Sequence, residues 1–140
     1  MVRIHQARVR VKTTGRIVVE NVTTVVAGAV TDAGVARGIA VVSVAHTTCG
    51  LAINEDEAGL REDIRRVAGA LLSPIAAQRP FEHDCVDDNA QAHLTSILLG
   101  HSVTIPVADS RLVLGTWQSI FLIEMDGPRE RYLDIQVIGE

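Results

Sequence analysis

The chain has 140 residues, a formal net charge of −4 and a hydrophobic share of 47%, while aromatic residues make up only 3%. The aliphatic content and a charged fraction of 21% exclude an intrinsically disordered chain, and the acidic balance argues against nucleic-acid binding. No apolar run approaches the roughly 20 residues that a membrane-spanning helix needs. A chain of this length buries only about two-thirds of its unfolded surface, so the aliphatic excess predicts self-association.

The cysteine content and the N-terminus indicate the cellular compartment. Cys49 and Cys85 are too few for a disulfide scaffold, and the N-terminus shows no signal-peptide core. We therefore expect a cytoplasmic protein with no membrane partner. The length predicts one domain, residues 1–140.

The N-terminal quarter predicts two strands followed by a helix. The strands are expected at Val2–Val11 and Ile17–Val19, on either side of a Thr-Thr-Gly turn. Apolar residues then recur at helical spacing over Val22–Ala33, with Asn21 as a candidate N-cap and Gly34 as the terminator.

The middle of the chain predicts a central strand and two more helices. Ile39–Ala45 is apolar on both faces, which is typical of a central strand. The next helix is expected to open at Asn54, with Glu57 completing a capping box. Residues 73–87 look irregular, and a third helix is expected from about Asp88 to Leu99, capped by its first residue and ended by a glycine. The expected buried stripe of the second helix is Leu60, Ile64, Val67, Ala68, Leu71 and Leu72.

The last forty residues predict antiparallel strands. Val103, Ile105 and Val107 alternate with polar or exposed positions, and residues 117–125 contain a run that is apolar on both faces. Asp126-Gly127-Pro128 is expected to turn a hairpin into a closing strand with Leu133, Ile135 and Val137 facing inward. The whole pattern predicts an α+β fold with a mainly antiparallel sheet and about three helices.

The first candidate site is the run His46-Thr47-Thr48-Cys49-Gly50, directly after the central strand. His46 has the strand parity of the buried valines before it, so we expect it to leave the core where a pocket begins. A neutral imidazole there can ligate a metal or move a proton. The alternative is a histidine at the core edge that bonds to backbone. Cys49 is either a nucleophile or, more commonly, a small buried hydrophobe.

A denser cluster of polar residues precedes and enters the third helix. It comprises His83, Asp84, Cys85, Asp87, Asp88, Asn89 and His93. At helical spacing Asn89, His93 and Ser96 share one face. Capping alone explains Asp88, whereas two histidines with three aspartates are typical of a functional site.

The three histidines His46, His83 and His93 predict a site for a divalent metal, Zn²⁺ or Mg²⁺, with an open position for water or phosphate. A structural zinc site that includes the two cysteines is disfavoured, because no pair has Cys-x-x-Cys spacing.

The C-terminal third adds two weaker candidate groups. Trp117 and Gln118 offer a flat wall and an amide to a small ring or phosphate, although a lone tryptophan is more often a core residue. Glu124 faces Arg129 and Arg131 across the expected hairpin, which predicts either a cross-strand ion pair or a phosphate site. His101 is expected to pack at a strand edge.

Seven motifs, in order along almost the whole chain, resemble the YjbQ family. They are His46-Thr47-Thr48, Asn54-Glu55, Asp87-Asp88-Asn89-Ala90-x-x-His93, Leu98-Leu99-Gly100, Ile105-Pro106-Val107, Arg111-Leu112-x-Leu114-Gly115-Thr116-Trp117-Gln118 and Asp126-Gly127-Pro128-Arg129. One of these motifs is weak evidence, and seven in sequence are specific. Cys49 departs from the family pattern, which often carries Ser or Ala there, and this weakens the nucleophile hypothesis.

The resemblance implies a fold, an assembly and an activity. It implies a compact α+β sheet sandwich that assembles as a homotrimer and a secondary thiamine-phosphate synthase activity. That reaction transfers a pyrimidine methyl group to a thiazole phosphate and releases pyrophosphate. The catalytic residues expected on this basis are His46, His83, His93, Asp87 and Asp88. The residues expected to contact a small phosphorylated ligand are Thr47, Asn89, Ser96, Trp117, Gln118 and Arg129.

Two other classes of function are compatible with the same residues. One is a metal-dependent hydrolase of unknown substrate, which the histidine–aspartate cluster would serve. The other is a non-catalytic ligand-binding trimer, which the aliphatic excess favours.

Overall fold

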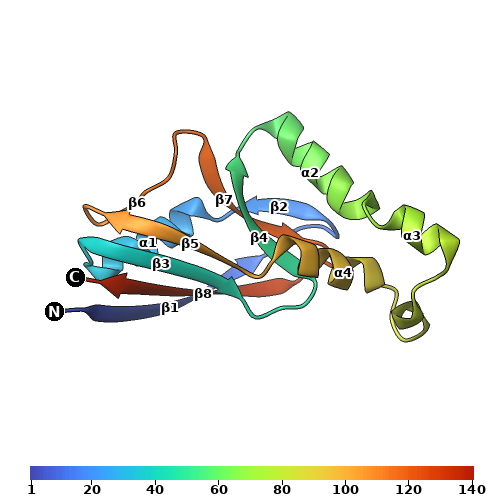
Figure 1. The fold of residues 1–140 in the computed structure, drawn as a ribbon, viewed down its shortest axis with the longest axis horizontal. Helices are drawn as coiled ribbons and strands as arrows, with labels where there is room; N and C mark the ends of the chain where they lie inside the picture. Colours follow the sequence, from blue (N-terminus) through green and yellow to red (C-terminus); the bar gives the residue numbers. More distant parts are fainter.

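Two antiparallel sheets share one apolar core (Figure 1). The computed structural model describes all 140 residues. The strands are β1 Arg3–Lys12, β2 Val18–Asn21, β3 Arg37–Val44, β4 Cys49–Glu55, β5 Ser102–Ala108, β6 Arg111–Leu112, β7 Gln118–Glu124 and β8 Glu130–Gly139. The larger sheet has the order β1-β8-β3-β5-β6 and the smaller one β2-β7-β4, which confirms the predicted α+β class.

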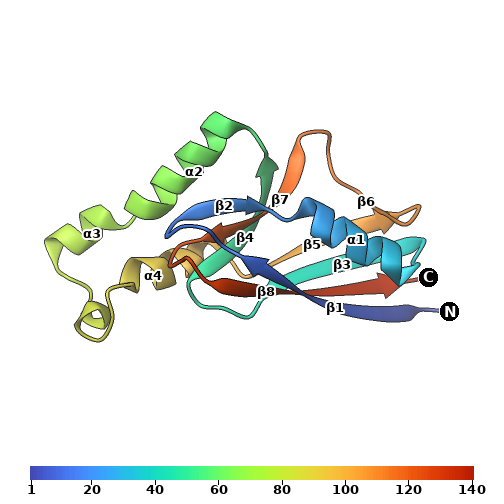
Figure 2. The same ribbon diagram turned by 180° about the vertical axis from the view of Figure 1, so that it is seen from behind.

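Four helices pack around the sheets. They are α1 Thr23–Ala33, α2 Ala58–Ala70, α3 Ser73–Gln78 and α4 Ala90–Leu99, with a 3₁₀ turn, η1, at Glu82–Cys85. Helix α1 lies against the larger sheet, whereas α2, α3 and α4 lie toward the end of the molecule away from the chain termini (Figure 2). No helix is long and apolar enough to cross a membrane.

The main core lies between α1 and the inner faces of both sheets. Val26 and Val30 of α1 are fully buried against it, although valine has poor helix propensity, so packing holds this helix. The predicted terminator is confirmed, since Gly34 ends the helix with a φ of 61°. The N-cap position is Val22, not the predicted Asn21, which is the last residue of β2 and accepts a hydrogen bond from the Thr23 amide.

Strand β8 lies between β1 and β3 in the larger sheet. Its inward residues Leu133, Ile135 and Val137 are at most 2% exposed, as the alternating pattern predicts. Strand β3 pairs with β8 on one side and β5 on the other, so the prediction of a central strand is confirmed, although its outer face is only partly covered and Ile39 is 41% exposed. In β7 every residue from Ile120 to Glu124 is buried, because α2 and α4 approach its outer face.

The segment before α2 corrects one sequence prediction. Residues 49–55 form strand β4 and pair with β7, so Asn54 lies in a strand opposite Ser119 and opens no helix. Glu57 is the cap instead, and its carboxylate accepts hydrogen bonds from the Gly59 and Leu60 amides at 2.8 and 2.7 Å. The four polar residues at 54–57 look like a helix start, and only the partner strand β7 makes their first half a strand.

Helix α2 is less buried than its pattern predicts. No residue of α2 is buried, and Val67 and Leu71 are 57% and 49% exposed. The following segment, expected to be irregular, contains α3 and η1. Helix α4 begins at Ala90, and the expected cap Asp88 does not act as one. The carboxylate of Asp84 accepts the Ala90 amide hydrogen bond instead.

The turn at Asp126-Gly127-Pro128 is not a hairpin. Strand β7 belongs to the smaller sheet and β8 to the larger one, so this turn carries the chain from one sheet to the other. The sequence shows the turn residues but not which strand each end joins. The crossover brings Glu124 and Arg131 together inside the protein.

Two glycine positions test the backbone packing. At Gly38 a Cβ atom would lie 2.0 Å from the Ile138 carbonyl oxygen, whereas at Gly28 on α1 it would meet nothing within 4 Å. We expect Gly38→Ala to lower the free energy of unfolding by at least about 1–3 kcal/mol, as overpacking does. Gly28→Ala should raise it by about 0.5–1 kcal/mol through helix propensity. Urea denaturation of both variants measures the signs, and a neutral Gly38→Ala would contradict the β3–β8 register.

Candidate functional site

A pocket opens where β3 ends beside α4. His46 and Thr47 line it from the β3–β4 connection, His93 and Ser96 line it from α4, and His101 lines it from the segment before β5. Ile97 and Gly100 complete the lining of this space of about 410 Å³. The fold therefore brings four of the residues that the sequence singled out into one pocket. No carboxylate lines the pocket.

The environment of His46 assigns its tautomer. Its Nε2 accepts a hydrogen bond from the Tyr132 amide at 3.0 Å, and its ring stacks on Tyr132 with centroids 6.3 Å apart. A nitrogen that accepts carries no proton, so the proton of the neutral ring is on Nδ1. Burial, and then the charge of Arg131, lower the pKa of His46. His46 is thus a neutral hydrogen-bond donor through Nδ1, and both sequence readings of it hold: it bonds to backbone and lines a pocket.

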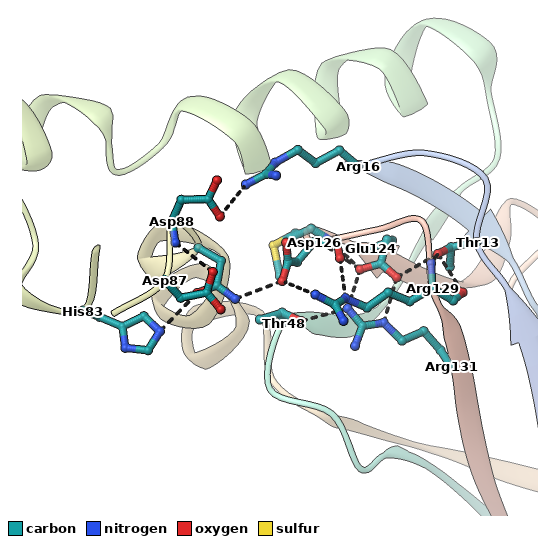
Figure 3. A network of polar contacts seen from close by, with 12 residues as sticks. Thr13, Arg16, Thr48, His83, Asp87, Asp88, Glu124, Asp126, Arg129 and Arg131 are labelled. Atoms are coloured by element: carbon teal, nitrogen blue, oxygen red, sulfur yellow. Dashed lines mark hydrogen bonds and ion pairs between the residues drawn. The ribbon is translucent and has the colours of Figure 1, made fainter. Parts of the chain in front are cut away.

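His83 contacts His93 but does not line the pocket. The two rings meet edge to face with centroids 4.8 Å apart. His83 Nε2 lies 3.1 Å from Asn89 Oδ1, and the Asn89 amide donates to Asp126 at 2.9 Å. Figure 3 shows this chain of contacts from His83 to Asp126 and on to Arg129. The predicted contact residue Asn89 is therefore a buried link between the histidine pair and the β7–β8 turn.

A buried ion pair lies at the centre of the same network. Arg131 donates to both carboxylate oxygens of Glu124, at 2.7 and 2.5 Å, and the two side chains are 5% and 0% exposed. Thr13 donates to Glu124 at 2.9 Å, and the amides of residues 125 and 126 donate to its other oxygen. Burial alone would raise the pKa of Glu124, but these hydrogen bonds bring it below its ordinary value.

The ion pair also supports the pocket, through hydrogen bonds made by Arg131 and by the next residue. Arg131 donates to the Thr48 hydroxyl at 2.8 Å, and the next residue, Tyr132, donates its amide to His46. One buried guanidinium therefore fixes both the chain segment that carries His46 and the strand that orients its ring. The sequence predicted Glu124 and Arg131 as either a cross-strand ion pair of a hairpin or part of a phosphate site; the ion pair forms, but it lies at a crossover between the two sheets.

In the single chain, three of the residues predicted to contact the substrate lie outside the histidine pocket. Gln118 pairs with Glu55, at the opposite end of β7 from the pocket, and its side chain accepts a hydrogen bond from the Gly115 amide. Trp117 precedes it in the loop before β7 and is 72% exposed. The Arg129 guanidinium donates to the backbone and side chain of Asp126.

The two predicted catalytic aspartates also lie outside the pocket. Asp87 and Asp88 sit on an exposed turn between η1 and α4, where Asp87 accepts a hydrogen bond from the Asp88 amide at 2.8 Å. Asp88 approaches Arg16 at 3.9 Å with an exposed side chain, as Figure 3 shows. Within one chain, these carboxylates make a local turn and a weak surface contact.

The two cysteines differ in environment. Cys49 is fully buried, and burial raises the pKa of its thiol to about 11, so it stays protonated at neutral pH. The nucleophile hypothesis for Cys49 is wrong, and the alternative of a small buried hydrophobe is confirmed. Cys85 is exposed in η1.

The residues do not fit a resident metal ion within one chain. No group of three or more His, Cys, Asp or Glu side chains is arranged to hold one. His46 uses Nε2 to accept a backbone hydrogen bond, and His83 is paired with Asn89. A metal bound by His46, His83 and His93 stays a prediction.

His101 is the pocket residue that sequence reasoning missed. It was expected to pack at a strand edge, but it lines the pocket together with His46 and His93. Its carbonyl oxygen accepts a hydrogen bond from the Val44 amide, so the β3–β5 pairing places it beside the end of β3. No local pattern signals this position, because the partner strand is 57 residues away in the sequence.

The fold and the histidine pocket define an α+β sandwich protein of a known family. The pattern of the family described as "UPF0047 protein YjbQ-like" matches residues 7–140. The chain belongs to this family. It is 35% identical over 137 residues to a UPF0047 protein of Methanothermobacter thermautotrophicus, and the match covers 98% of this chain and 94% of that relative.

Solved structures share the fold closely. A YbjQ-like protein of unknown function from Sulfolobus solfataricus superposes with a TM-score of 0.94 at 37% identity and covers all of both chains. A hypothetical protein from Aeropyrum pernix superposes with a TM-score of 0.90 at 43% identity, covering 96% of this chain and 98% of its own.

The buried ion pair makes a stability prediction. Glu124→Ala leaves the Arg131 guanidinium buried and unpaired, so we expect the free energy of unfolding to fall by about 3–5 kcal/mol. The exposed pair Arg8–Asp134 is the control, and Arg8→Ala should cost far less, because water screens a surface ion pair. The double variant Glu124→Leu with Arg131→Met should recover most of the loss. Equal losses for Glu124→Ala and Arg8→Ala in urea denaturation would contradict this picture.

His46 should titrate below the ordinary histidine value of about 6.5. Protonating Nε2 would set two donors, the ring and the Tyr132 amide, against each other. Because the folded pKa is the lower one, the folded state binds fewer protons, and stability falls as the pH drops through 6.5 toward that pKa. Histidine NMR titration measures the value. A His46 that titrates above 6.5 would refute the tautomer assignment.

Proposed function

We propose that the histidine pocket binds the phosphate groups of a small phosphorylated heterocycle and supports thiamine-phosphate synthase chemistry. The observation that carries the proposal is the chemistry of the lining. Three imidazoles and a threonine hydroxyl surround the space, and no carboxylate competes with an anion for them. Such a lining favours a diphosphate or phosphate over a cation.

The reaction needs charge stabilisation more than covalent catalysis. The bond between the pyrimidine methylene carbon and the diphosphate oxygen breaks, and its electron pair leaves with pyrophosphate. The thiazole nitrogen then donates its lone pair to the methylene carbon and becomes the positively charged ring nitrogen of thiamine phosphate. No proton has to be removed, so the enzyme's task is to hold both substrates and stabilise the departing diphosphate.

The pocket residues contribute different hydrogen-bonding groups to this task. Neutral His46 donates through Nδ1, and its orientation is set before the substrate arrives, because Tyr132 holds the other nitrogen. His93 and His101 add two further imidazoles to the same space. The Ser96 hydroxyl already donates to the Cys49 carbonyl at 2.7 Å, so Ser96 offers an acceptor and a fixed wall rather than a donor to phosphate.

The proposal includes assembly as a homotrimer. Apolar side chains on α4 and β3 support self-association, since Ile97 and Leu98 are 77% and 63% exposed and Ile39 is 41% exposed. Trp117, Gln118 and Arg129 can serve the substrate if a neighbouring subunit brings them to the pocket. Asp87 and Asp88 have the same requirement.

Alanine substitutions in the pocket test the activity. His46→Ala and His93→Ala should each reduce the rate of thiamine phosphate formation by about 10²–10³-fold, the effect of removing one preorganised donor. His5→Ala is the matched control, because His5 lies on β1 outside the pocket. The assay supplies the pyrimidine methyl diphosphate and the thiazole phosphate to purified protein and measures thiamine phosphate and pyrophosphate.

Two results would reject the proposed activity. One is an unchanged rate in both pocket variants, and the other is a His5→Ala variant that loses as much rate as they do. Circular dichroism of each variant shows whether the fold is intact.

A further inference from the structure

A chain of polar contacts ends on the His93 ring, which lines the histidine pocket. Arg129 donates to Asp126 at 3.1 Å, and the Asn89 amide nitrogen donates to the same carboxylate oxygen at 2.9 Å. The Asn89 carbonyl oxygen lies 3.1 Å from His83 Nε2, and the His83 ring meets the His93 ring edge to face. Figure 3 shows this chain as far as His83. The contacts therefore link the β7–β8 turn to a residue of the pocket lining.

The hydrogen bonds in this chain each have one possible direction. Burial raises the pKa of Asp126, but the hydrogen bond from Asn89 and the charge of Arg129 bring that pKa below its ordinary value. The carboxylate is therefore ionised and only accepts, so the Asn89 amide nitrogen faces it and the carbonyl oxygen faces His83. That oxygen also only accepts, which places the proton on His83 Nε2. The ionised carboxylate thus sets the orientation of the amide and of the imidazole.

Asn89 makes these contacts in place of the helix cap that its position favours. It is the N-cap residue of α4, where an asparagine side chain ordinarily accepts a hydrogen bond from an amide of the first turn, and its side chain makes none. Asp84 accepts the hydrogen bond of the Ala90 amide instead. Asn89 is only 7% exposed, and both polar groups of its side chain are used within the chain. The side chain is therefore committed to Asp126 and His83.

The two histidine rings depend on this anchor. His83 is exposed in η1, where a side chain without a fixed partner samples several rotamers. The His93 ring makes no hydrogen bond within the chain, and its one ring contact is the edge contact with His83. An aromatic side chain in a helix has two common χ1 rotamers, and a change between them would turn the His93 ring away from its present place. The hydrogen bond to Asn89 restrains His83, and His83 in turn restrains His93.

We propose that Asn89 is a positioning residue which, anchored on Asp126, fixes the His83 ring and thereby holds His93 toward the histidine pocket. In this role His83 supports His93 and does not contact the substrate. The consequence for the reaction rests on the proposed function, since it requires His93 to stabilise the departing diphosphate. A donor contributes most to such a step when its orientation is set before the charge develops.

The variant His83→Gln separates positioning from a merely structural tie. The glutamine Nε2 can still donate to Asn89 Oδ1, but no ring remains beside His93. We expect the three-bond NMR couplings of His93 to report one χ1 rotamer in the wild-type chain and an average of rotamers in His83→Gln. A tie between η1 and α4 would survive this change and leave His93 in one rotamer. His5→Gln, on β1 outside the pocket, is the matched control and should leave His93 unchanged.

The variant Asn89→Ala tests the anchor itself. It removes both hydrogen bonds, so the His93 couplings should average as they do in His83→Gln. In the thiamine phosphate assay, both variants should lower kcat about 10–100-fold and leave KM within about twofold, because they reduce stabilisation of the transition state rather than binding. Should Asn89→Ala not fold, His83→Gln at its exposed position decides the question alone.

The positioning role is overturned if His93 already averages between rotamers in the wild-type chain or keeps one rotamer in His83→Gln. It is also overturned if His93 averages in His83→Gln while kcat stays at the wild-type value. The NMR measurement uses no substrate. A wild-type chain that forms no thiamine phosphate would therefore reject the proposed function, and the rotamer of His93 would still decide the positioning role.

Discussion

The ion pair between Glu124 and Arg131 lies where β7 leaves the smaller sheet and the chain crosses to β8. Taking two opposite charges out of water is costly, and attraction between them offsets the cost only when the remaining polar atoms are also satisfied. Here Thr13, Thr48 and two backbone amides complete the set. The pair therefore joins the end of β1, the segment after β3 and the start of β8 at one point between the sheets.

The histidine pocket depends on this point. His46 is held by the Tyr132 amide, and Tyr132 follows the buried Arg131, so the ring orientation rests on the same arginine that closes the crossover. Asn89 and Asp126 extend the polar network from the crossover to the His83–His93 pair. Stability and site geometry thus share one network, and a change in it should affect both.

Helix α4 contributes side chains on two sides. One side carries His93 and Ser96 to the histidine pocket, and the other carries Thr95 and Leu99 toward α2 and the smaller sheet. A helix used on both sides shows no single clean apolar stripe. The spacing of polar residues on α4 predicts that His93 and Ser96 share a face, and the structure places both on the lining of the histidine pocket.

Some of the site is readable from the sequence because it depends on short-range spacing. His93 and Ser96 share a face since they lie about one helical turn apart, and His46 emerges from the core because strand parity alternates. The motif order also predicts the family. The placement of His101 in the pocket and of Trp117 outside it cannot be read from short-range spacing. Each depends on which strands pair and on the register of that pairing.

The amino-acid sequence by itself determined the α+β class, the end of α1 at Gly34, the inward face of β8 and the membership of the YjbQ-like family. These follow from local periodicity, a terminating glycine and the order of motifs along the chain, and none of them requires knowing which strands pair. Only the tertiary structure decided that residues 49–55 form a strand, that the 126–128 turn joins two sheets, and that the Glu124–Arg131 pair is buried. Each of these depends on a partner distant in the chain, and local propensity contains no information about that partner.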